Sequence, residues 1–105
     1  MATATDWRQI LQLYDQLASL VPSPVVALNR AVAVAEVEGP AAALTIVDRL
    51  GLHDFHLFHA IRADLLRRPG RNVEAALAYD AAIARTCNAA ERDFLQRSRQ
   101  ALTQA

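Results

Sequence analysis

The sequence contains no lysine, and all eleven of its basic residues are arginine. Its single cysteine, Cys87, excludes a disulfide within the chain and favours a reducing compartment. No apolar run approaches the roughly 20 residues that a membrane span needs. The N-terminal residues lack the basic and apolar segments of a secretory signal, so we expect a cytoplasmic protein that does not enter a membrane.

The charges balance, with eleven arginines against eleven acids in 105 residues. A chain of this length fits one domain with a modest core, and a net charge of zero disfavours binding through neutralised phosphates. Asp64 stands at helical spacing from Arg67 and Arg68, and Asp93 from Arg97. Such pairs are typical of a solvated helix face, so we expect no direct contact with nucleic acid.

Proline and glycine divide the chain into helical segments. The six helices that we expect span about residues 6–20, 24–37, 40–50, 54–68, 72–86 and 89–103. Asp6 and Ser23 are the expected N-caps of the first two, and Asn88 with Glu91 has the pattern of a capping box. No segment alternates as a strand does, so the sequence predicts an all-α protein.

The second helix is apolar on nearly every side, so we expect it at the centre of the fold. Its polar pair, Asn29 and Arg30, would be buried and would need partners. The favoured interpretation is a structural clamp, with Arg30 paired to an acid such as Asp64 or Asp80. The alternative is a recognition site for a peptide or a small ligand.

Helices four and five carry the spacing of a tetratricopeptide (TPR) repeat. Its residues are Ala63, Leu66, Gly70, Ala75, Tyr79 and Ala82. Small residues let the paired helices approach, the aromatic ring fills the space between them, and glycine permits the turn. His59 occupies the position where the repeat has tryptophan, and with Asn29, Arg30 and Asp64 it is one of four candidate interaction or clamp residues. We therefore expect residues 1–105 to form one TPR-like domain, a right-handed stack of three antiparallel helical hairpins.

The chain resembles the C-terminal extension of one bacterial group of extracytoplasmic-function (ECF) sigma factors in residues 22–33, followed by 38–44, and in residues 59–71. Glu74-Ala75, Tyr79, Asn88, Glu91-Arg92 and Phe94-Leu95 fit the same pattern. The likeness covers roughly Tyr14 to Leu95. It implies a TPR-like appendage without the sigma regions two and four that bind polymerase and promoter DNA.

The resemblance implies a non-enzymatic domain that regulates transcription initiation. Its expected partners are the sigma regions of a parent protein or an accessory protein, with core RNA polymerase engaged indirectly. The alternatives are a free-standing scaffold or oligomerisation module and a small-ligand sensor. Trp7 and Ile10 in the first helix suggest an exposed terminal face, so self-association is a further expectation.

The remaining polar residues predict no chemistry. His53, His56 and His59 cannot all share one helix face and lack cysteine ligands, so no metal site is expected. Cys87 has no histidine base beside it, and no phosphate-binding loop is present, so we expect neither catalysis nor a cofactor. The aromatic residues, namely Trp7, Tyr14, Phe55, Phe58, Tyr79 and Phe94, are interpreted as core.

Overall fold

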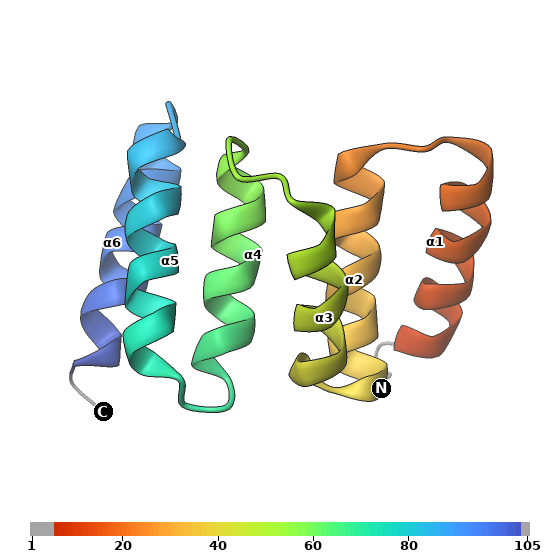
Figure 1. Ribbon diagram of the computed structural model, residues 1–105, viewed down its shortest axis with the longest axis horizontal. Coiled ribbons are helices and arrows are strands. Elements are labelled where there is room, and N and C mark those ends of the chain that lie inside the picture. Colours follow the sequence, from red (N-terminus) through yellow and green to blue (C-terminus); the bar gives the residue numbers. More distant parts are fainter. Residues whose placement is uncertain (1–5, 104–105) are drawn as a thin grey trace, which may run out of the picture.

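The computed structural model describes residues 6–103, and every regular element in that range is an α-helix. The six helices are α1 (Trp7–Leu20), α2 (Pro24–Glu38), α3 (Pro40–Leu50), α4 (His56–Arg67), α5 (Asn72–Arg85) and α6 (Ala89–Leu102). Figure 1 shows them running alternately up and down, so that successive helices form hairpins. The predicted all-α stack of helical hairpins is confirmed.

Helix α2 lies at the centre of one half of the stack. It packs on α1, on α3 and also on α4, while the most extensive pairing in the described residues is between α4 and α5. The helices repeat at a near-constant period. The odd-numbered helices begin at Trp7, Pro40 and Asn72, which are 33 and 32 residues apart, and the even-numbered helices show the same spacing.

The core is continuous from α2 to α6, and α1 contributes partly buried side chains such as Leu11. Five of the six residues with the TPR spacing are buried within it, namely Ala63, Leu66, Ala75, Tyr79 and Ala82. Gly70 lies in the turn between α4 and α5 with φ of +83°. The Arg71 N–H closes this turn by donating to the Leu66 carbonyl at 3.0 Å. Glycine adopts this left-handed conformation without the steric cost of a Cβ.

The helix caps follow the sequence in part. Asp6 accepts a hydrogen bond from the Gln9 N–H at 3.1 Å, and Asn88 accepts one from the Glu91 N–H at 2.9 Å. Ser23 occupies the N-cap position of α2 as expected, although its side chain makes no capping hydrogen bond. The capping box is also incomplete, since the Glu91 carboxylate binds His56 instead of turning back to Asn88.

Two expectations about burial were wrong. Helix α2 is not enclosed on all sides, because Val25 in its first turn is 43% exposed and Asn29 and Arg30 are only half-buried. The first turn of α2 directly follows the connection from α1, so it lies at one end of this helix pair and meets solvent. Phe94, which we expected in the core, is 59% exposed on α6.

A candidate interaction groove between α4 and α6

A groove of about 360 Å³ lies where α4, α5 and α6 meet. We call it the α4–α6 groove. Its lining consists of Ala60, Asp64, Arg67, Tyr79, Phe94, Leu95, Ser98 and Ala101. Tyr79 and Leu95 are buried, whereas Phe94 extends into solvent. The groove therefore joins an apolar floor to an exposed aromatic ring, an arrangement that suits the apolar side chains of another polypeptide.

The polar side of the groove is a chain of charges from α4 to α2. Asp64 accepts from the Arg67 Nη2 at 2.6 Å, and its other oxygen lies 3.0 Å from the Arg68 Nη2. Arg68 continues to the Glu36 carboxylate of α2 at 3.0 Å. The expected pairing of Asp64 with both arginines is confirmed. Because each charge has a partner, the groove presents oriented polar groups without an unpaired buried charge.

Tyr79 gives the groove a neutral hydroxyl. Burial, followed by the negative charge of Asp64, raises the pKa of the Tyr79 phenol above its ordinary value. The hydrogen bond from Arg67 to Asp64 raises the pKa of the Arg67 guanidinium. The phenol thus stays protonated and the guanidinium charged, so this end of the groove offers hydrogen-bond donors.

The four candidate site residues do not form one site. Asp64 lies in the α4–α6 groove, but Asn29 and Arg30 lie on α2 and His59 lines a different pocket, with Asp48. Arg30 binds Asp15 of α1, at 2.5 Å from Nε to Oδ1, and neither Asp64 nor Asp80. That prediction of its partner was wrong. Asp15 lies on the neighbouring helix across the hairpin, whereas Asp64 pairs on its own helix.

The Arg30 pair belongs to a series. Arg62 of α4 binds Asp48 of α3 at 2.8 Å. Arg99 of α6 lies 2.6 Å from Asp80 of α5. In each case the arginine of an even-numbered helix reaches an aspartate on the helix before it. The three aspartates, Asp15, Asp48 and Asp80, follow the period of the helices, which indicates that the pairs mark equivalent interfaces.

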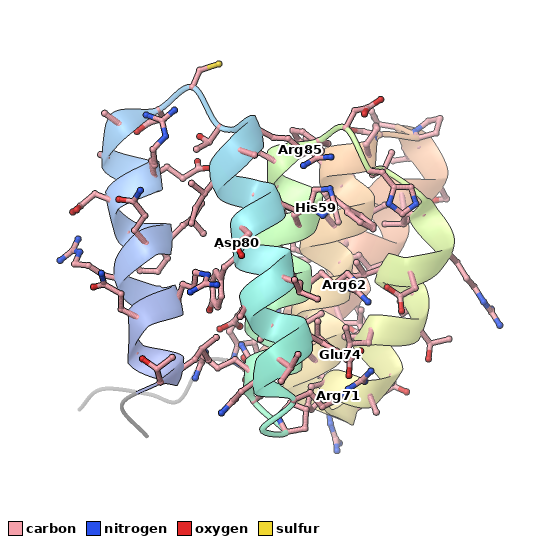
Figure 2. The ribbon with its side chains drawn as sticks, turned by 60° about the vertical axis from the view of Figure 1, so that its left-hand side comes forward. His59, Arg62, Arg71, Glu74, Asp80 and Arg85 are labelled. Carbon is pink, nitrogen blue, oxygen red and sulfur yellow. The ribbon has the colours of Figure 1, made fainter. Side chains whose placement is uncertain are left out.

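His59 binds the loop between α3 and α4. Its Nε2 lies 2.6 Å from the His53 carbonyl oxygen, which also accepts a 2.8 Å bond from the Arg85 Nε of α5. Figure 2 shows His59, Arg62 and Arg85 along adjoining parts of α4 and α5. Burial lowers the pKa of the His59 imidazole, and the positive charges of Arg85 and other neighbours lower it further. The His53 carbonyl bond opposes that shift.

The groove residues that the sequence did not single out are on α6. Phe94, Leu95, Ser98 and Ala101 recur at helical spacing, so periodicity alone would place them on one side of α6. Their facing partners, Ala60 and Arg67, belong to α4, and α5 separates the two helices in the chain. Helical periodicity identifies a face but not the distant helix that it faces.

In residues 6–103, no three or more histidine, cysteine, aspartate or glutamate side chains are grouped so that they could hold a metal ion. None of the helices in that range has the length and apolar character to cross a membrane.

Comparison with known proteins finds a relative whose function is uncharacterized. An uncharacterized protein of Rhizobium meliloti (strain 1021) is 49% identical over 94 residues, which make up 88% of this chain and 22% of that protein. The chain therefore spans about a fifth of the length of the curated relative it matches. No family model matches the sequence. No solved structure matches it either.

Proposed function

We propose that this helical array is a non-enzymatic interaction domain that regulates an ECF-type sigma factor in transcription initiation. The sequence resemblance between Tyr14 and Leu95 supports this proposal, and the α4–α6 groove offers a surface for the contact. Its partner would be the sigma regions of a longer protein or an accessory protein, with core RNA polymerase engaged through them.

The observation that carries the proposal is the position of Phe94. It is 59% exposed at the edge of a groove whose floor, at Tyr79 and Leu95, is buried. Exposed aromatic residues beside buried apolar pockets are typical anchors of protein interfaces. The groove volume of about 360 Å³ suits a few side chains of a docked segment.

The charged side of the groove would fix the direction of that segment. Asp64 and Arg67 lie at one end, and Phe94 and Leu95 are on the opposing helix. An apolar side chain of the partner would pack against Phe94, while its polar groups would meet Arg67 and the Tyr79 hydroxyl. Docking of this kind shifts the population of sigma factor that engages polymerase, because it binds one arrangement more tightly than the other.

The test is a binding titration with matched variants. The probe is the part of the Rhizobium meliloti relative that lies outside the matched segment, expressed separately. Phe94→Ser should weaken binding by roughly tenfold or more, as expected for an interface anchor. Leu77→Ser is the control, because Leu77 is a similarly exposed apolar residue, at 65%, outside the groove. It should bind as the unmodified chain does.

Absence of binding, or equal losses from both substitutions, would contradict the proposal. A transcription assay with core polymerase then asks whether the contact changes initiation. Binding that leaves initiation unchanged would favour the free-standing scaffold. The small-ligand alternative at Asn29 and Arg30 is less favoured, because the Asp15 carboxylate already engages the Arg30 guanidinium.

A further inference from the structure

Helix α1 differs from the other five helices because none of its residues is buried. Its outer side carries leucines, with Leu13 59% exposed, Leu17 39% and Leu20 78%. These residues recur at spacings of four and three, so they form one stripe along the helix. No charged residue interrupts the stripe between Leu13 and Leu20 at those spacings.

The repeat register shows what this stripe corresponds to. Trp7, Pro40 and Asn72 begin α1, α3 and α5 at equivalent positions. Leu13 and Leu17 of α1 therefore correspond to Ile46 and Leu50 of α3, and to Ala78 and Ala82 of α5. In α5 both positions are buried, at 3% and 0% exposure, and in α3 both are partly buried against the core.

The neighbours of the odd-numbered helices explain the difference. Helix α3 packs on the helix before it, α2, and on the helix after it, α4; helix α5 likewise packs on α4 and α6. Within residues 6–103, α1 has extensive contacts only with the helix after it, α2. The Asp15–Arg30 pair marks that contact as equivalent to Asp48–Arg62 and Asp80–Arg99. The side of α1 that a preceding helix would cover is the exposed side.

We propose that the leucine stripe of α1 holds a further helix of the α2 kind, supplied by a neighbouring segment of a longer polypeptide. More than three quarters of the Rhizobium meliloti relative lies outside the matched segment, so homologous arrays do occur inside longer chains. The proposal does not depend on the function of the α4–α6 groove.

The chemistry of that helix follows from the stripe. The bulky Leu13 and Leu17 correspond to Ile46 and Leu50, which are partly buried against a core that includes Ala31 and Val34 of α2. The incoming helix would accordingly carry a small residue followed by a larger apolar one at a spacing of three or four. It would carry no charge on this side, because the stripe offers none to pair with it.

A chimera tests the fit directly. A second copy of residues 22–39 is placed immediately before Trp7, so that the added Gly39 occupies the position that it has before α3. The control chimera carries Ala31→Glu and Val34→Glu in the added copy alone. We expect the first chimera to melt several degrees above the control, because it buries Leu13 and Leu17. Hydrogen exchange should also show the amides of α1 protected in the first chimera only.

Equal melting temperatures and equal protection of α1 in the two chimeras would overturn the proposal. Light scattering tests the alternative that a second copy of the chain covers the leucine stripe. If the unmodified chain forms a dimer that Leu13→Glu dissolves, the first chimera should be a monomer. A dimer that persists in that chimera would assign the stripe to self-association and overturn the proposal.

Discussion

At the scale of single residues, the polar contacts of this protein hold neighbouring helices together at their edges. Asp15, Asp48 and Asp80 recur with the helical period, and each binds an arginine of the next helix. The side chains of the first pair are 34% and 50% exposed. Water screens such pairs, so each one contributes far less than a buried ion pair would.

The Arg30–Asp15 pair should accordingly be a weak clamp. Arg30→Ala should lower the free energy of unfolding by about 0.5–1 kcal/mol, and the double-mutant cycle with Asp15→Ala should give a coupling energy within that range. Urea denaturation measures both. Arg97→Ala is the control, because the Arg97–Asp93 pair is 70% and 65% exposed on one helix and should contribute less. A coupling of 3 kcal/mol or more, of the order found for buried pairs, would restore the buried-clamp interpretation.

His59 makes stability depend on pH. Its folded pKa lies below the ordinary value of 6.5, first because of burial, so the unfolded chain binds the proton more readily. Where the unfolded state holds more protons, stability rises with pH. The contribution of His59 is therefore complete above pH 6.5 and is lost as the pH falls below it toward the folded pKa.

The measurement is urea denaturation of the wild type and of His59→Gln between about pH 5 and 7.5, around the ordinary histidine pKa. The substitution should flatten the rise in stability across that interval, because glutamine retains a donor for the His53 carbonyl but does not titrate. Parallel curves for the two proteins would show that His59 does not cause the dependence.

At the scale of elements, proline and glycine made the helix boundaries predictable. Pro24 and Pro40 begin α2 and α3, and Gly39 and Gly51 end α2 and α3 as expected. The fourth helix was predicted two residues too early, because residues 54 and 55 form the loop that His59 and Arg85 fasten. Such a loop depends on contacts from α5, which local sequence does not encode.

The turn between α4 and α5 should be sensitive to its glycine. A Cβ at Gly70 would meet no atom within 4 Å, so any cost must come from its φ of +83°. Gly70→Ala should therefore lower stability by about 1–2 kcal/mol, and Gly70→Asn should lower it less, because asparagine tolerates positive φ. Thermal denaturation of the two variants tests the order. Equal effects would point to a cause other than backbone conformation.

At the scale of the whole molecule, periodicity predicted the stack but not the surfaces that it creates. The TPR spacing identified the tightly packed α4–α5 pair from residues such as Ala63 and Tyr79 within 20 positions of each other. The α4–α6 groove lies between helices that are separated in the chain by the whole of α5. Phe94 was mistaken for core because apolar character alone does not distinguish the edge of a groove from the interior. The partner of Arg30 was missed for a related reason, since the packing of α1 on α2 decides it.

The same arrangement predicts an uneven stability along the stack. Contacts in a repeat array pass between neighbouring helices, and α1 has no buried residue and packs chiefly on α2, whereas α4 and α5 share the most extensive pairing. Native-state hydrogen exchange should therefore release the amides of α1 roughly tenfold faster or more than those of α4 and α5. In the chimera with the added α2 copy, α1 should gain protection while α5 is unchanged. Uniform exchange across the six helices would mean that the array unfolds only as one unit. The exposed leucines of α1 would then not mark an end of lower local stability.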